Sequence, residues 1–277
     1  MEENTVHWID ETDIAEFNRA EYIQRELGDI FRKQDLDDPR VLAYCQPVYN
    51  LRTQCYDTAE ALMRLDLKET GIITPEQFIP LAEENGYIHV LTKIILHKTC
   101  ESIRNLIEGG YKITRISVNV SVPELKDEKF CEDIIGIISR SRIPGDKIAI
   151  ELTESQSESD FLVMKAKIDQ LRNEGIKFYL DDFGTGYSNM ERIMELPFDI
   201  IKFDKSLVTA SESAERSQKI VANLANMFTD MNYSVLYEGV EKDSEEEMCR
   251  HMAAAYLQGY KYSKPIPIED LRQYVAS

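Results

Sequence analysis

The feature of this sequence that most constrains its fold is a regular alternation of short apolar runs with segments of helical periodicity. The expected strands cover residues 58–65, 115–121, 147–153, 177–182, 199–203, 234–238 and 256–257, and the expected helices include 127–141, 157–174 and 214–231. This pattern predicts an α/β fold, a TIM-type (β/α)8 barrel in which helices surround a ring of strands. A doubly wound open sheet shows the same alternation and is the alternative.

The first strand departs from this alternation. Val41–Tyr49 and Thr58–Leu65 both have the composition of strands. Only about eight residues separate them, too few for a crossover helix. The two segments therefore predict a hairpin, with the first barrel strand antiparallel to the second.

The N-terminal residues differ in character from the rest of the chain. Asp13–Gln34 is densely charged and carries apolar residues at helical spacing, and an aspartate-rich stretch with a proline at 35–39 ends it. We expect an N-terminal helix or linker over residues 1–39, followed by the barrel over residues 40–277. An amphipathic helix packed on the domain surface and a linker helix from an upstream module both fit this pattern.

A pair of adjacent carboxylates ends the strand expected at 177–182. Asp181 and Asp182 follow an apolar run, and Gly184 and Gly186, which come after Phe183, indicate that the strand stops and turns there. If the backbone turns there, both carboxylates can face one space, where hard cations such as Mg²⁺ or Mn²⁺ would offset their repulsion. A solvated turn whose aspartates cap the next helix is the simpler alternative.

Other polar side chains stand at the ends of the remaining expected strands. In barrels of this kind the active site lies at the C-terminal ends of the strands. Five acids, an amide and a lysine at one focus would suit a two-cation site that hydrolyses phosphodiesters. The residues at these positions are Glu60, Arg64, Asn119, Glu151, Glu154, Asp181, Asp182, Lys202, Asp204, Glu238, Glu241 and Gln258, with Gln46 on the same face if its strand is antiparallel.

The composition narrows the possible partners. The formal net charge of −18 argues against binding long nucleic acids but allows a small anionic substrate beside metal ions. The five cysteines form no C-x-x-C pair, which indicates a reduced, cytoplasmic protein. The four histidines lack the spacing of a zinc site, and we find neither a signal peptide nor an apolar stretch of membrane-spanning length.

An ordered series of motifs resembles one known family. The series runs through Ala59-Glu60-Ala61-Leu62-Met63-Arg64, Val118-Asn119-Val120-Ser121, Glu151-Leu152-Thr153-Glu154, Asp181-Asp182-Phe183-Gly184-Thr185-Gly186, Lys202-Phe203-Asp204, Glu238-Gly239-Val240-Glu241 and Gln258-Gly259-Tyr260. It is similar to the EAL domains, the cyclic di-GMP phosphodiesterases. The resemblance covers about residues 40–275, and it implies a TIM-type barrel with an antiparallel first strand.

The resemblance also implies an activity. We expect a hydrolase of bacterial second-messenger signalling that converts 3′,5′-cyclic di-GMP to linear 5′-pGpG with two Mg²⁺ or Mn²⁺ ions. Lys202 would hydrogen-bond the attacking water near the general-base role, and Glu60 and Glu241 would join it in the catalytic group. Asp181 would bridge the two ions. The full set of implied metal ligands is Glu60, Asn119, Glu151, Asp181, Asp182 and Glu238.

Further residues are expected to hold the substrate and a loop. Arg64 would meet a phosphate, and Glu154 would hold the loop at 182–189, which couples metal binding to dimerisation in the family. The implied substrate-binding residues are Gln46, Leu62, Arg64, Asp204 and Gln258. The resemblance further suggests a homodimer and an upstream sensory or GGDEF-type domain in a longer parent protein.

A cyclic di-GMP receptor with little or no turnover is the alternative function. Receptors of this fold typically lose some of the acids, the lysine or the loop residues, whereas this sequence retains all of them. Its departures, such as Tyr237 before Glu238 and Leu65-Asp66 after Arg64, remove no metal ligand.

Overall fold

The computed structural model describes residues 11–153, 158–186 and 190–276. Its centre is a closed barrel, because β1 pairs with β2 on one side and with β9 on the other. All neighbouring strands from β2 to β9 around the ring are parallel, and β1 is antiparallel to both of its neighbours. The eight strands of the ring are β1 (Val41–Asn50), β2 (Cys55–Leu67), β4 (Arg115–Asn119), β5 (Ile148–Leu152), β6 (Lys177–Phe183), β7 (Ile200–Phe203), β8 (Ser234–Tyr237) and β9 (Tyr256–Leu257).

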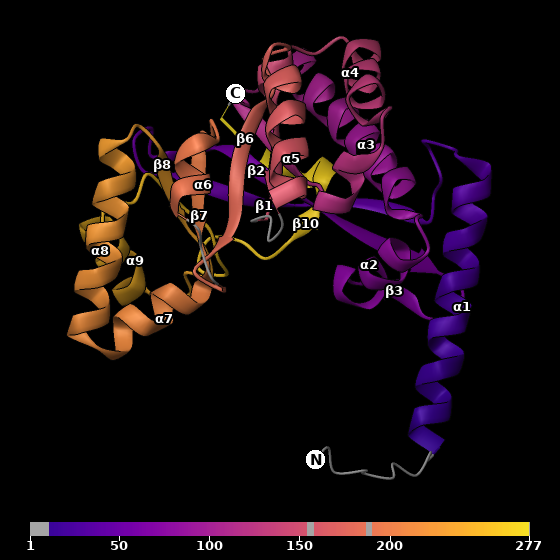
Figure 1. Cartoon of the computed structure of the whole chain (residues 1–277), viewed down its shortest axis with the longest axis horizontal. Coiled ribbons are helices and arrows are strands. Elements are labelled where there is room, and N and C mark those ends of the chain that lie inside the picture. Colours follow the sequence, from indigo (N-terminus) through magenta and orange to yellow (C-terminus); the bar gives the residue numbers. More distant parts are fainter. Residues whose placement is uncertain (1–10, 154–157, 187–189, 277) are drawn as a thin grey trace.

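Helices surround this ring, as the alternation predicts, and the TIM-type barrel with an antiparallel first strand is confirmed (Figure 1). The helices α3, α4 and α5 lie together over one part of the ring, and α7, α8 and α9 lie over another. The bounds are α2 (Pro75–Glu84), α3 (Ile88–Glu108), α4 (Phe130–Ser141), α5 (Glu158–Arg172), α6 (Met190–Glu195), α7 (Lys205–Ser213), α8 (Glu215–Asp230) and α9 (Asp243–His251).

Several short elements differ from the sequence-based expectation. Two short strands, β3 (Gly71–Ile73) and β10 (Ile266–Pro267), extend the sheet beyond the ring. Near the C-terminus, where apolar spacing also predicts a helix at about 268–275, the structure has a 3-10 helix, Ile268–Gln273, and not an α-helix. The buried side chains Ile268 and Leu271 lie three residues apart, a spacing that suits either kind of helix, so the pattern alone could not distinguish them.

The helix α1 (Glu11–Lys33) precedes the barrel and packs against α2 and α3. Its C-terminal part contributes Tyr22, Ile23, Leu27 and Ile30 to the main hydrophobic core. Its N-terminal part projects away from the barrel (Figure 1), and the Phe17 side chain there is 68% exposed. The helix thus combines an ordinary packed half with a half that has apolar residues in solvent. No helix in the described part of the chain is both long and apolar enough to span a membrane.

The inside of the barrel is built in layers. Val48, Ala149, Tyr179, Ile200 and Leu236 form a separate buried apolar cluster, with one residue from each of five strands. Side chains two residues apart on a strand face the same way. The next layer toward the C-terminal ends of the parallel strands therefore also points inward, and it consists of polar residues.

Candidate active site

Lys202 stands at the centre of this polar layer. It follows Ile200 by two residues on β7, so its side chain enters the barrel, where it is 1% exposed. Burying an ammonium without partners is costly, and here the partners are carboxylates from four other strands. Lys202 Nζ lies 2.6 Å from Glu151 Oε2, 2.8 Å from Asp181 Oδ1, 2.9 Å from Glu238 Oε1 and 3.4 Å from Glu60 Oε2.

The Glu60 carboxylate is held by two amides in addition to Lys202. Asn119 Nδ2 donates to Glu60 Oε1 at 2.7 Å, and Gln258 Nε2 donates to Glu60 Oε2 at 2.7 Å. Gln258 Nε2 also donates to Gln46 Oε1 at 3.0 Å, and Gln46 Nε2 donates to the Ser263 carbonyl at 2.9 Å. Gln46 pairs with Glu60 in the β1–β2 register, which puts it on the site as the antiparallel hairpin requires.

The structure also brings Asp181 and Asp182 to one place. Oxygen atoms of Asp181, Asp182 and Glu238 lie within 4.8 Å of one another, as a metal ion would need. The cause is a backbone irregularity in β6 between Leu180 and Phe183. Asp182 has a φ of 55°, a left-handed conformation that aspartate tolerates better than most residues. The turn thus occurs at Asp182 itself, before the glycines to which the sequence argument attributed it.

The charges in this layer perturb one another strongly. Burial and the nearby Glu60 carboxylate raise the pKa of Glu151 well above its usual value. Burial and the Asp181 carboxylate raise the pKa of Glu238 to about 8, against the opposing effect of Lys202. Burial by itself would lower the pKa of Lys202, but the surrounding carboxylates outweigh it and raise that pKa well above the usual value. Lys202 is therefore an ammonium ion in this arrangement.

These residues fit a site for hard divalent cations. Five carboxylates, including the neighbouring Asp182, share the single positive charge of Lys202, and cations would offset the remaining repulsion. Oxygen ligands of this kind are the ones Mg²⁺ and Mn²⁺ prefer. In addition, Gln258 Oε1 is buried without a hydrogen-bond donor among the described residues, so an acceptor stays open beside Glu60.

A cavity of about 460 Å³ opens beside the carboxylates. Asn119 and Asp182 line its inner side, and Leu62, Ile79 and Val120 are among its apolar walls. Leu62, expected from the sequence to meet substrate, is therefore on a concave surface next to the polar layer. The volume falls in the range of small-molecule sites.

The remaining expected site residues lie outside the polar layer. Arg64 is further along β2, where its Nη1 donates to the Met63 carbonyl at 2.7 Å and its guanidinium lies over the Tyr44 ring. Glu241 Oε1 accepts from Lys205 Nζ at 2.5 Å. Asp204 caps α7, since its Oδ1 accepts from the Ser206 backbone N–H at 2.8 Å. Glu154 and the end of the loop at 187–189 lie outside the described residues.

Sequence reasoning missed some residues near these groups. Lys205, which pairs with Glu241, gave no signal beyond a position after a strand. A second set of possible ligand atoms, from Asp37, His97 and Glu101, lies between the start of the barrel and α3. The i, i+4 spacing of His97 and Glu101 on one helix was its only sequence signal, and Glu101 already pairs with Arg104 at 2.8 Å.

The chain forms a closed α/β barrel, and carboxylates and a lysine gather at the C-terminal ends of its strands. These features indicate a barrel protein whose active-site residues can bind cations. The EAL domain family matches residues 32–265 of this chain. The chain belongs to the EAL domain family.

Known proteins of this family resemble the chain over most of its length. The cyclic di-GMP phosphodiesterase PdeL of Escherichia coli K12 is 32% identical over 235 residues, which cover 84% of this chain and 64% of PdeL. The probable cyclic di-GMP phosphodiesterase PdeB of the same organism is 32% identical over 244 residues, covering 88% of this chain and 46% of PdeB. The chain thus spans about half to two thirds of the length of these two relatives.

Solved structures agree with the fold. The c-di-GMP complex of the PaMucR phosphodiesterase superposes with a TM-score of 0.80 at 27% identity, and the match covers 89% of this chain and 99% of that one. An EAL domain protein from Listeria monocytogenes EGD-e gives a TM-score of 0.75 at 25% identity, with coverages of 88% and 94%.

Proposed function

We propose that this chain hydrolyses 3′,5′-cyclic di-GMP to linear 5′-pGpG in bacterial signalling, with the help of two divalent cations. The observation that supports this most is the ring of four carboxylates around Lys202, which come from Glu60, Glu151, Asp181 and Glu238. The names of PdeL and PdeB and the c-di-GMP bound to PaMucR support the choice of substrate.

The proposed metal ligands are those that the family resemblance implies, and the clustering of Asp181, Asp182 and Glu238 oxygens within 4.8 Å supports part of the set. Glu60, Asn119, Glu151 and Asp181 would hold one Mg²⁺ or Mn²⁺ ion, and Asp181, Asp182 and Glu238 the other. Such ions, when bound, lower the pKa of a coordinated water and stabilise negative charge on the attacked phosphate. Because Asp181 and Asp182 project from one turn of β6, both ions would depend on the same short backbone segment.

Lys202 would hydrogen-bond the attacking water and act near the general-base role, as the family resemblance implies. Without cations, the surrounding carboxylates outweigh burial and raise the pKa of the Lys202 ammonium. Bound cations would compete with Lys202 for these carboxylates and so lower that pKa. Attack of the water oxygen on phosphorus would form a new P–O bond and break the P–O3′ bond. The proton that the water loses would pass to solvent, and the 3′ oxygen would take a proton from solvent.

The cavity beside the site supports the binding of a nucleotide. Leu62 and the apolar walls would contact a base, while Gln46 and Gln258 offer amide groups next to the Glu60 carboxylate. We keep Arg64, whose guanidinium lies over the Tyr44 ring, as a phosphate contact. Asp204 and Glu241 stay proposed contacts to substrate and to metal-bound water, respectively.

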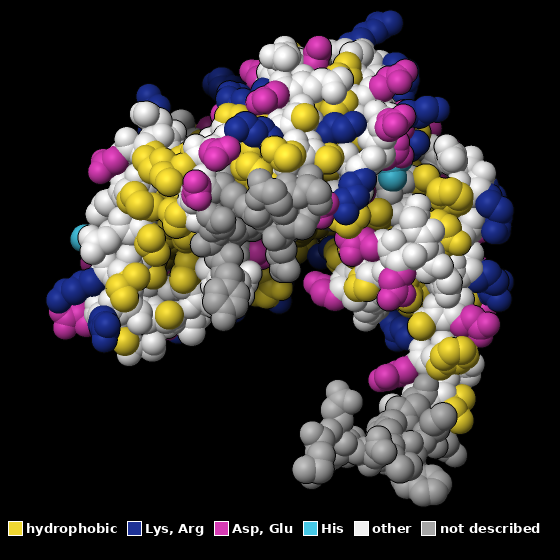
Figure 2. Space-filling model, in the orientation of Figure 1, with side chains coloured by type: hydrophobic (Ala, Val, Ile, Leu, Met, Phe, Trp, Pro, Cys, Tyr) yellow, Lys and Arg dark blue, Asp and Glu magenta, His cyan; other side chains and the backbone are white. Residues whose placement is uncertain are grey.

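A homodimer in the cytoplasm is the form we propose. Figure 2 shows hydrophobic side chains gathered over α6 and α8, where Met194 and Ile220 are 51% and 52% exposed. Such a patch on a charged protein indicates a contact surface. The five cysteines are unpaired, which suits a reducing compartment.

The test is incubation with cyclic di-GMP and Mg²⁺ or Mn²⁺, with pGpG followed by chromatography. We expect product with wild type and a loss of about a thousandfold or more in the Glu60→Gln variant, since the charge at a metal ligand is removed. Binding of cyclic di-GMP without product in either metal would favour the receptor alternative. Full activity in Glu60→Gln would refute the metal assignment.

A further inference from the structure

A second concave surface lies at the end of the barrel opposite the carboxylates. It is formed by the C-terminal part of α3, the connection into β4, the end of α4 and the connection into β5. Since β4 and β5 are parallel, these connections lie at their N-terminal ends, whereas Asn119 and Glu151 stand at the other ends. We call this surface the basal groove; its volume is about 1070 Å³.

The basal groove is strongly cationic in a protein with a formal net charge of −18. One acid, Glu108, is among its lining residues. The lining cations are Arg104, Lys112, Arg140, Arg142 and Lys147.

These cations differ in how far they are already neutralised. Arg104 pairs with Glu101 at 2.8 Å, and Lys147 Nζ donates to the uncharged Ile113 carbonyl at 2.9 Å. Arg140 and Arg142 are exposed. Within residues 11–153, 158–186 and 190–276, no carboxylate lies within 4.0 Å of either guanidinium.

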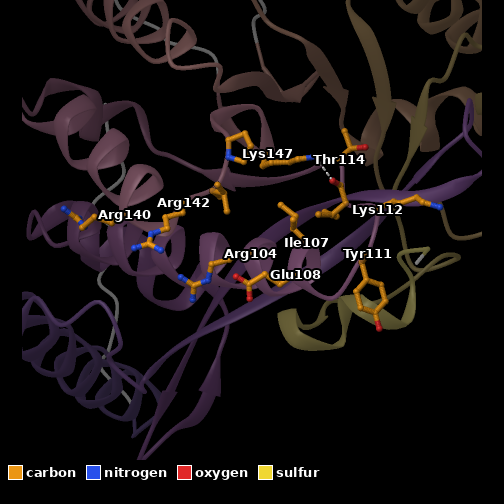
Figure 3. Close-up of a pocket in the computed structure, with 12 residues that line it drawn as sticks. Arg104, Ile107, Glu108, Tyr111, Lys112, Thr114, Arg140, Arg142 and Lys147 are labelled. Carbon is orange, nitrogen blue, oxygen red and sulfur yellow. Dashed lines mark hydrogen bonds between the residues drawn. The ribbon is translucent and has the colours of Figure 1, made fainter.

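The shape of the groove suits an extended ligand. Figure 3 shows the labelled cations spread along the groove from Arg140 to Lys112, and they do not converge on one point as they would around a single phosphate. Apolar surface lies between the charges: Ile107 is 41% exposed, and Ile143 and Pro144 also line the groove. An extended chain with alternating acidic and apolar groups would satisfy both kinds of surface.

We propose that the basal groove docks an acidic, partly apolar polypeptide segment of a partner protein. A nucleic acid fits less well, because the rest of the surface repels a long phosphate backbone. The groove also offers a single aromatic ring, the half-buried Tyr111, where single-stranded nucleic acids use several stacking platforms. A segment bound here would leave the opposite, carboxylate end of the barrel open to substrate.

The experiment measures binding of a short fluorescein-labelled peptide of glutamates interspersed with leucines by fluorescence anisotropy. We expect wild type to bind it, and the double variant Arg140→Glu, Arg142→Glu to bind about tenfold more weakly, since two exposed charge contacts become repulsive. The matched control is Arg216→Glu, Lys219→Glu on α8, which makes the same change in net charge away from the groove and should bind like wild type. Circular dichroism verifies that both variants are folded.

The other occupants are outcomes of the same experiment. Equal weakening in both double variants would assign the binding to overall charge and overturn the proposal. A labelled single-stranded oligonucleotide that binds wild type more tightly than the peptide would assign the groove to nucleic acid instead. A wild-type dimer in sedimentation velocity that the Arg140→Glu, Arg142→Glu variant loses would assign it to a second copy of the chain. Competition between the peptide and cyclic di-GMP would place the peptide at the carboxylate end of the barrel and would overturn the proposal.

Discussion

Lys202 Nζ lies 2.6 Å from Glu151 Oε2, and each of these two side chains is 1% exposed. Glu151 alone would be an isolated carboxyl in a dry interior, with its pKa raised by burial. Lys202 extends from β7, two strands away from β5, to pair with Glu151, and it contacts three further carboxylates at the same time. The ammonium therefore supplies positive charge to the same oxygens that cations would bind.

The first prediction concerns the competition between Lys202 and metal ions. Lys202→Met removes the ammonium from among the carboxylates and leaves buried acids uncompensated. In chelator we expect the free energy of unfolding to fall by about 3 kcal/mol, measured by urea denaturation. Mn²⁺ should then raise the melting temperature more than it does in wild type, because metal binding no longer displaces Lys202.

Lys205→Met is the matched control for this change. Lys205 is 54% exposed and pairs with Glu241 outside the polar layer. Its removal should therefore leave the free energy of unfolding and the effect of Mn²⁺ on the melting temperature near the wild-type values. A Lys202→Met protein that responds to Mn²⁺ less than wild type would show that the ammonium supports the metal site and does not compete with it.

The second prediction concerns Asp182. Asp182→Asn keeps a residue that tolerates the left-handed conformation but removes one of three clustered carboxylates. We expect the dissociation constant for Mn²⁺ to rise by about tenfold, since affinity at oxygen sites follows the ligand charge. Isothermal titration measures it, with Asp230→Asn on the exposed end of α8 as control. Unchanged Mn²⁺ binding in Asp182→Asn would remove Asp182 from the ligand set.

The third prediction concerns pH and Glu124. Burial raises the pKa of the Glu124 carboxyl from 4.5 to about 7, although the Ser121 backbone N–H donates to it at 2.9 Å. The protonated carboxyl is therefore favoured in the folded state, and ionising it destabilises the fold. This contribution to the free energy of unfolding is fully present below pH 4.5 and is lost as the pH rises toward 7. The loss approaches about 3 kcal/mol at most.

Glu124→Gln keeps an acceptor for the Ser121 N–H and cannot ionise. Its free energy of unfolding should therefore improve relative to wild type between pH 5 and pH 8, as measured by denaturation at each pH. The neighbouring exposed Glu128→Gln should show a flat difference over the same range. If the difference in free energy of unfolding between Glu124→Gln and wild type also did not change with pH, the buried carboxyl would not retain its proton.

The fourth prediction separates the two halves of α1. Leu27 is 0% exposed in the main core, so Leu27→Ala should lower the free energy of unfolding by about 2 to 5 kcal/mol. Phe17 is 68% exposed, and Phe17→Ala should change the free energy of unfolding by no more than about 0.5 kcal/mol. Equal effects of the two substitutions in urea denaturation would contradict the packing of the C-terminal half.

Much of the fold and of the polar layer could be predicted from the sequence. The two-residue periodicity of a strand determines which side chains face into the barrel. The position of a residue relative to the end of its strand determines where along the barrel axis its side chain lies. Glu151 and Lys202 therefore had to meet once the strands closed into a barrel. The hairpin loop was too short for a helix, so the direction of β1 and the position of Gln46 followed as well.

Other features depended on choices that the pattern does not encode. The left-handed backbone at Asp182 is one of several ways to turn after a strand, and a strand-end acid such as Asp204 can serve a site or cap a helix equally well. The position at a strand end predicts a site role for Asp204, and the structure shows that this residue also caps α7. The contact of the Arg64 guanidinium with the Tyr44 ring also depends on the side-chain conformation, which the motif does not encode.

The direction of β1 has a consequence for its connection to α1. Val41 pairs with Leu65, beyond the level at which Gln46 pairs with Glu60, so the strand starts above the carboxylates and runs down past them. In a barrel whose strands are all parallel, the first strand begins at the end of the barrel opposite the active-site residues. Here the residues between Lys33, the end of α1, and Val41, the start of β1, lead into the barrel at the end where the carboxylates lie. The chain therefore connects α1 directly to the carboxylate end of the barrel.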